Sequence, residues 1–146
     1  SHLTPMDLIQ AITSGDLGKT TVTLPIFNTE TDKGIFEVRE LTVEGRINVR
    51  RNSIRKLDEP DKDGQDQYIY DDNRYRAALV AEATHYPDGR RVFDGLDIVD
   101  RLLKLPGKFD PAFQALFTAA QDLSFATPSA EATARKNSSK SRKPAT

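Results

Sequence analysis

Residues 71–125 read DDNRYRAALVAEATHYPDGRRVFDGLDIVDRLLKLPGKFDPAFQALFTAAQDLSF, and this segment holds the clearest helix signals of the chain. Its first helix is predicted to run to Tyr86. The Pro87–Gly89 turn then reverses the chain, because proline fixes φ and glycine accepts a positive φ. Two shorter helices follow, beginning at the capping residues Asp94 and Asp110. The stretch therefore predicts three successive helices.

Apolar residues line the two shorter helices at helical spacing. In the first helix they are Leu96, Val99, Leu102, Leu103 and Leu105, and in the second Phe113, Leu116, Phe117, Ala120 and Leu123. The first interpretation of such apolar stripes is that they pack in the hydrophobic core. Two short helices on a small domain can also leave apolar surface exposed, and that surface would be a partner groove or an oligomer contact.

The N-terminal half contributes the β-structure. Thr4 caps a short helix, and the alternating segments 20–24 and 35–41 form a β-hairpin around a turn-like segment. Helical spacing then returns in residues 43–57, which precede an acidic loop, residues 58–67. The sequence therefore predicts an α+β fold: a small, mostly helical domain with an N-terminal β-hairpin.

Charge separates the chain into two parts. The 146 residues carry a formal net charge of −1, whereas the segment after Pro128 has five basic residues and one acidic residue, a charge of +4. Residues 127–146 also lack apolar periodicity and cannot bury enough surface to offset their conformational entropy. We therefore expect an acidic domain in residues 1–126 and a disordered basic tail in residues 127–146.

No pattern of catalytic, metal-binding or cofactor-binding residues emerges. The chain has no cysteine, and His85 has no neighbouring histidine to complete a ligand set. The acidic loop fails the EF-hand pattern, because Glu59 and Tyr70 fall where that site needs its first ligand and its bidentate glutamate. Residues 15–20 end like a phosphate-binding loop but lack its first glycine. The prediction is a protein without catalytic residues, metal or cofactor.

The order of the elements and two short phrases resemble a known family. Residues 38–42, VRELT, end a strand and lead into a helix, and residues 87–93, PDGRRVF, follow a helix and precede the acidic cap Asp94. A closing helix around residues 116–123 completes the order. In this arrangement the chain is similar to the tail assembly chaperones of long-tailed phages and prophages.

The resemblance implies a non-enzymatic protein of the host bacterial cytoplasm that binds the tape measure protein and keeps it soluble. It also implies help for tail tube polymerisation, in which a longer, frameshifted form recruits the tail tube protein. No apolar run reaches the ~18 residues of a membrane helix, so we expect no membrane partner. We expect partner contacts at Leu103, Leu105, Phe109, Phe113 and Phe117. A core role for all five stays open.

Two other functions stay open. A nucleic-acid-binding protein would use the basic tail and the arginines within residues 46–55, although the acidic charge of the domain opposes phosphate binding. A structural head–tail connector or tail terminator would have a similar small α+β fold and would form rings. The sequence leaves the oligomeric state undecided.

Overall fold

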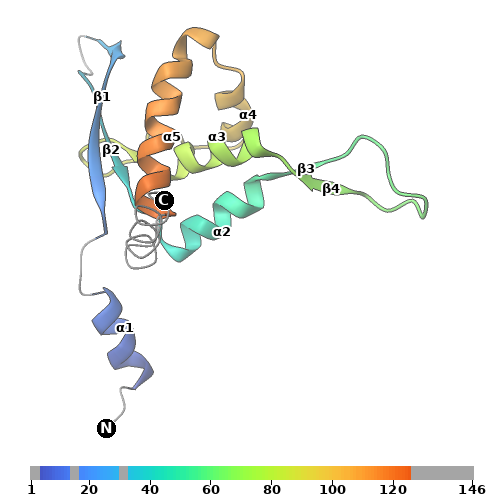
Figure 1. Cartoon of the computed structure of the whole chain (residues 1–146), viewed down its shortest axis with the longest axis horizontal. Coiled ribbons are helices and arrows are strands. Elements are labelled where there is room, and N and C mark those ends of the chain that lie inside the picture. The colour runs from blue at the N-terminus through green and yellow to red at the C-terminus, as the bar shows by residue number, and fades with distance from the viewer. Residues whose placement is uncertain (1–3, 14–16, 30–32, 126–146) are drawn as a thin grey trace, which may run out of the picture.

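The fold is α+β, as predicted, with helices gathered beside a small antiparallel sheet (Figure 1). The computed structural model describes residues 4–13, 17–29 and 33–125. The predicted basic tail, residues 127–146, lies outside these ranges.

The described elements form one antiparallel sheet, one separate hairpin and the helices around them. In chain order they are α1 (Pro5–Thr13), β1 (Lys19–Asn28), β2 (Lys33–Arg39), α2 (Val43–Asn52), β3 (Ile54–Lys56), β4 (Tyr68–Tyr70), α3 (Asp72–Ala83), β5 (Thr84–His85), α4 (Ile98–Leu103), the 3-10 turn η1 (Gly107–Phe109) and α5 (Asp110–Ser124). The sheet has the strand order β1–β2–β5, and β3 pairs with β4. The predicted hairpin is therefore present, and β5 adds a strand to it that the sequence did not predict.

One face of the sheet carries part of the core. In the hairpin Val22 pairs with Phe36 and Thr20 pairs with Val38. Phe36 and Val38 lie on the same face, because side chains alternate along a strand, and both are buried. Leu41 was predicted to lie in this strand, but it follows the end of β2 and is buried there. Helix α5 packs across β1 and β2.

Helix α3 lies at the centre of the core and is the most buried of the described helices. Leu79 and Val80 are fully enclosed, and buried alanines surround them. The helix contacts α2, α4 and α5, and the apolar run of residues 77–81 suits such a central position. Its start is fixed by Asp71, whose carboxylate accepts the N–H of Arg74 at 3.1 Å.

Helix α2 is shorter than predicted. It ends at Asn52, whereas the sequence placed its end at Leu57. The buried Ser53 hydroxyl donates to the carbonyl of Val49 at 2.6 Å and closes the last turn. Residues 54–56 then form β3 instead of continuing the helix.

Helix α3 ends at Ala83, not at Tyr86 as predicted. Thr84 leaves the helix because it pairs with Val38 of β2. The predicted turn follows β5: the N–H of Gly89 donates to the carbonyl of Tyr86 at 2.9 Å, and Gly89 has a φ of 98°. The chain reversal was therefore located correctly, and the helix boundary before it was wrong.

Helix α4 begins at Ile98 and not at the predicted cap Asp94. The Asp94 carboxylate instead accepts the N–H of Gly95 at 2.9 Å, within the turn that precedes the helix. Asp97 takes the position before the helix with a φ of 61° and makes no side-chain capping bond. Leu96, predicted on the helix, lies before it and is 90% exposed.

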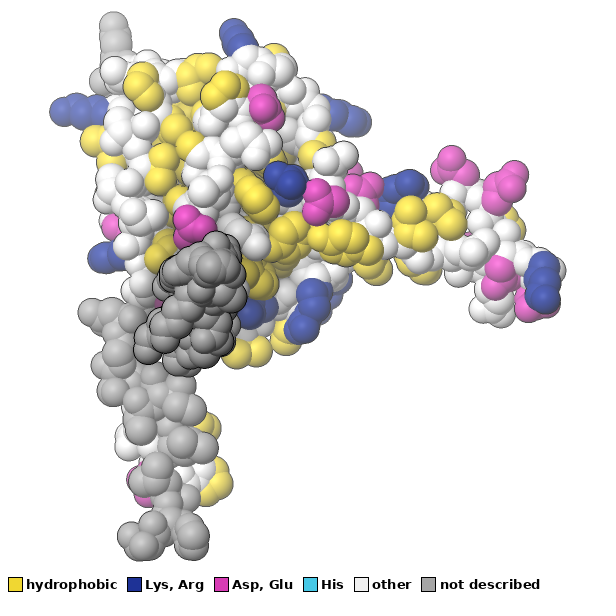
Figure 2. All heavy atoms as spheres, viewed as in Figure 1, with side chains coloured by type: hydrophobic (Ala, Val, Ile, Leu, Met, Phe, Trp, Pro, Cys, Tyr) yellow, Lys and Arg dark blue, Asp and Glu magenta, His cyan; other side chains and the backbone are white. Residues whose placement is uncertain are grey.

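A two-stranded arm, residues 54–70, projects from the body between α2 and α3 (Figure 1). It consists of β3, β4 and the loop between them, which contains the acidic loop predicted for residues 58–67. Figure 2 shows hydrophobic side chains that continue from the body onto the arm, and acidic and basic side chains at its end. The loop was predicted from the sequence, but its two strands were not.

Candidate functional site

An apolar pocket opens between α4, η1 and α5. Its volume is about 180 Å³. The apolar lining includes Leu102, Leu103, Leu105, Pro106, Phe109 and Phe113, and the polar lining includes Asn73, Arg76, Asp110 and Gln114. Four of the five residues predicted to contact a partner therefore surround one cavity.

The turn between α4 and α5 shapes this pocket. The N–H of Phe109 donates to the carbonyl of Pro106 at 3.0 Å and closes η1. Helix α5 follows directly: Phe109 takes the cap position, and the predicted cap Asp110 is the first helical residue without a side-chain capping bond. The Phe109 ring stacks on Phe27 of β1, with 5.4 Å between the ring centroids. Strand β1 thereby supports one wall of the pocket.

Exposure separates the rim of the pocket from its floor. Leu103 is 42% exposed and Leu105 is 40% exposed, whereas Leu102 is buried. Phe109 and Phe113 are half-buried. Exposed apolar area is the part of a side chain that still gains free energy on leaving water. Leu103 and Leu105 are therefore surface residues, and a partner would cover them first.

Phe117, the fifth predicted residue, does not line the pocket. Its ring packs edge-on against Tyr75, with 6.0 Å between the centroids, and the Arg76 guanidinium lies 4.7 Å from its ring centre. Arg76 also pairs with Asp72 at 2.9 Å and contributes to the pocket lining. Arg76 therefore separates the pocket from the aromatic cluster that contains Phe117.

The polar lining of the pocket was missed in the sequence. Asn73 and Arg76 lie one turn apart on α3, and Asp110 and Gln114 lie one turn apart on α5. The Gln114 side-chain amide lies 3.4 Å from the Asp110 carboxylate, to which it donates a hydrogen bond. Polar pairs at these spacings share one side of a helix, and that spacing is the signal that would have located them.

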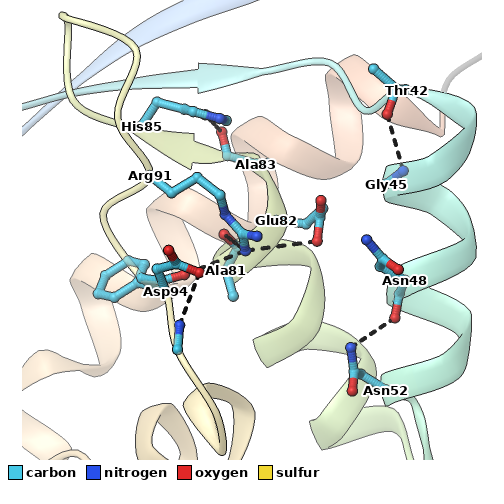
Figure 3. Close-up of polar contacts among 12 residues, drawn as sticks. Thr42, Gly45, Asn48, Asn52, Ala81, Glu82, Ala83, His85, Arg91 and Asp94 are labelled. Atoms are coloured by element: carbon cyan, nitrogen blue, oxygen red, sulfur yellow. Dashed lines mark hydrogen bonds and ion pairs between the residues drawn. The ribbon is translucent and has the colours of Figure 1, made fainter.

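A second pocket, of about 160 Å³, is polar and lies where α2, α3 and the segment before α4 meet. In Figure 3 the Arg91 side chain reaches α3, where Nη2 donates to the carbonyl of Ala81 at 2.8 Å and lies 3.7 Å from the Glu82 carboxylate. Asn48 and Asn52 come from α2, and the Asn52 amide donates to the carbonyl of Asn48 at 2.9 Å. The Arg91 contacts fasten the segment after β5 to α3, whereas the Asn52 bond lies within α2. None of these bonds brings a nucleophile beside a base.

His85 and the acidic loop have structural partners. The Nδ1 atom of His85 lies 2.8 Å from the carbonyl oxygen of Ala83, the last residue of α3. In the loop, Asp61 Oδ1 accepts the N–H of Asp63 at 2.8 Å and that of Gln65 at 2.9 Å.

Within the described residues, no cluster of three or more potential ligand side chains could hold a metal ion. In the same ranges, no helix combines the length and apolar character needed to cross a bilayer.

The apolar pocket between α4, η1 and α5 is a stronger candidate for a binding site than the polar pocket. Exposed apolar walls with a few polar groups at the rim suit a segment of another protein, which would cover the leucines and satisfy the polar groups.

Comparison of the chain with protein-family models, with curated proteins and with solved structures finds no match.

Proposed function

We propose that this protein is a non-enzymatic tail assembly chaperone of a long-tailed phage or prophage, and that it binds the tape measure protein in the host bacterial cytoplasm. The observation that carries the proposal is the apolar pocket between α4 and α5 with its exposed leucine rim. The resemblance of the VRELT and PDGRRVF phrases and of the element order to this family supports it.

The pocket suits one large apolar side chain of a partner helix. An apolar cavity of about 150 Å³ accommodates a benzene ring, so the volume of about 180 Å³ has room for a leucine or phenylalanine side chain. Arg76, Asn73 and Gln114 offer hydrogen-bonding groups to the residues that flank that side chain. A helix that presents apolar residues at successive turns would bind here by the helix-in-groove mode.

The expected strength of one contact agrees with a chaperone that binds and later leaves. Burying one leucine side chain contributes about 1.5–3 kcal/mol. This is less than the roughly 4 kcal/mol that corresponds to a millimolar complex. A tape measure protein repeats apolar helical turns along a long chain, so several copies can bind it at once. Copies that also contact one another have a higher effective concentration for the next site on the tape measure protein, while each single contact stays reversible.

Co-expression with the tape measure protein of the same phage tests the proposal. The wild-type chain is expected to keep the tape measure protein in the soluble fraction and to co-purify with it at both low and high salt, because an apolar contact is not screened. The double variant Leu103→Gln/Leu105→Gln should lose this activity. Leu96→Gln is the matched control, since Leu96 is more exposed than either leucine but lies outside the pocket.

Circular dichroism and thermal unfolding of each variant show whether the fold is intact, and the exposed positions predict melting temperatures close to that of the wild type. Two outcomes contradict the proposal: a tape measure protein that stays insoluble with the wild-type chain, or equal activity of the pocket variant and the Leu96→Gln control. Retention of nucleic acid that high salt removes would instead favour binding through the basic tail.

A further inference from the structure

The arm, residues 54–70, projects without the support of a third strand. Within the part of the chain that the structure describes, β3 and β4 pair only with each other, and a two-stranded hairpin alone is marginally stable in water. Its base is fastened to the body: Arg55 pairs with Asp71 at 3.0 Å, and the N–H of Asp71 donates to the carbonyl of Ser53 at 2.7 Å. The arm is therefore held in place while its surfaces stay open.

One face of the arm is rich in apolar and aromatic groups. Ile54 pairs with Tyr70 and Lys56 pairs with Tyr68, so that these four residues share one face. Tyr68 is 57% exposed and Tyr70 is 59% exposed, and Ile54 is exposed as well. Aromatic side chains are enriched where proteins meet, because they bury large areas at a small cost in conformational entropy.

The end of the arm is acidic. Residues 57–67 contain five acidic side chains and one lysine, a formal charge of −4. Asp58, Glu59 and Asp63 form no ion pair with any residue that the structure describes. Repulsion from phosphates therefore opposes nucleic acid as the partner of this surface. A fitting partner presents an apolar stripe that ends in cations.

Helix α2 of this same chain has such a surface. Val43, Ile47 and Arg50 lie along one side of the helix, with Arg51 beside them. Val43 is 76% exposed, Ile47 is exposed, and both arginines are exposed. Neither arginine forms an ion pair within the described ranges. The helix thus offers apolar side chains followed by two unpaired cations.

The arm cannot reach α2 of its own chain. Only Ser53 separates the end of α2 from the start of β3, and Figure 1 shows the arm leading away from the helix. The contact between Arg55 and Asp71 holds the arm in that direction. The complementary surfaces can therefore meet only between two copies.

We propose that the protein self-associates through its arms, each arm lying along α2 of a second copy. The face with Tyr68 and Tyr70 covers Val43 and Ile47. The acidic end of the arm meets Arg50 and Arg51. The length of α2, about 15 Å for ten residues, is similar to what the strands and the first loop residues of the arm can span. This inference does not rest on the proposed chaperone function.

A charge exchange in the full-length chain tests the contact by sedimentation velocity over a range of protein concentrations. The wild type is expected to form dimers or larger assemblies. Arg50→Glu/Arg51→Glu and Asp58→Lys/Glu59→Lys should each weaken self-association by more than about tenfold, because like charges then face each other. An equimolar mixture of the two variants should recover association, since each altered arm then meets an altered helix of opposite charge.

The apolar part of the contact is tested on the two faces of β4. Tyr68→Ser should weaken association, whereas Ile69→Ser should not, because Ile69 lies on the opposite face of the same strand. Both changes remove an exposed apolar side chain from the arm, so a loss caused by a weakened hairpin would appear in both variants.

Three outcomes overturn the proposal. The first is a wild-type chain that stays monomeric at millimolar concentration. The second is self-association that persists in both charge variants or that their mixture fails to restore, which would place the contact elsewhere. The third is loss of association in Lys140→Glu/Arg142→Glu but not in Arg50→Glu/Arg51→Glu, which would make the basic tail the partner of the acidic loop.

Discussion

Replacing Ser124 with alanine removes the bond that fastens the end of α5 to the chain just after β2. The N–H of Leu41 donates to the Ser124 hydroxyl at 2.9 Å, and both residues are buried. The bond joins positions 83 residues apart. In Ser124→Ala the Leu41 amide keeps its buried place and loses its acceptor.

The expected loss of stability follows from two opposing contributions. A buried amide without an acceptor costs about 1–3 kcal/mol. Alanine recovers part of this loss, because it is a better helix former than serine by about 0.5 kcal/mol. We therefore expect the free energy of unfolding of Ser124→Ala to be lower than that of the wild type by about 0.5–2.5 kcal/mol.

Urea unfolding followed by circular dichroism measures this difference. Thr118→Ala is the matched control, because Thr118 is exposed on the same helix and its replacement adds helix propensity. The control should be at least as stable as the wild type. If Ser124→Ala is as stable as Thr118→Ala at an unchanged denaturant slope, the Leu41 amide does not depend on Ser124 and the reasoning is refuted.

Gly34→Ala should destabilise the protein far more than Gly64→Ala. Both glycines have a positive φ, but a Cβ at Gly34 would lie 2.3 Å from a backbone carbonyl oxygen, whereas a Cβ at Gly64 would meet no atom within 4 Å. Equal shifts in the melting temperatures of the two variants would contradict this prediction. The N–H that Arg74 donates to Asp71 is the main reason why the pKa of that carboxyl lies below its ordinary value of 3.8. The ionised Asp71 carboxylate therefore stabilises the folded state above pH 3.8, and this contribution is lost as the pH falls through the folded pKa. Because Asp71→Asn lacks the titrating carboxyl group, acid titration should show a smaller loss of stability in this variant than in the wild type.

The helical half of the fold was predictable because its signals act locally. Asp71, the Pro87–Gly89 turn and the Pro106–Gly107 stop each fix the backbone next to them. Helices α3 and α5 accordingly lie close to their predicted places. The same stop turns the chain after α4 and brings Leu103 near Phe109, so that four of the residues expected to contact a partner line one pocket. Their contact with a partner stays a prediction.

Strand pairing depends on distant residues, and two of the errors in helix boundaries have this cause. Ile47 and Ile54 are seven residues apart, which fits a helix, yet Ile54 pairs with Tyr70 across the loop. Thr84 likewise leaves a strongly helical segment because Val38 offers it a strand partner. Neither pairing leaves a signal within the segments concerned, since strands of two or three residues are too short for a period to be recognised.

Phe117 is the one residue of the expected partner contacts that does not line the pocket. It belongs to the same apolar stripe as Phe113, and the spacing alone cannot say which neighbour each ring meets. In the structure the rotation of α5 turns Phe117 toward Tyr75 and beneath Arg76. Both of those residues come from α3, so the outcome depends on how the two helices pack.

The bond between Leu41 and Ser124 also sets an order for events during synthesis. A chain leaves the ribosome from its N-terminus at about 5–20 residues per second, so α5 emerges last among the described elements. Until then the sheet face around Phe36 and Val38 lacks the helix that packs on it, and the apolar pocket lacks its second wall. A nascent chain can therefore complete neither its core nor this pocket before α5 has left the ribosome.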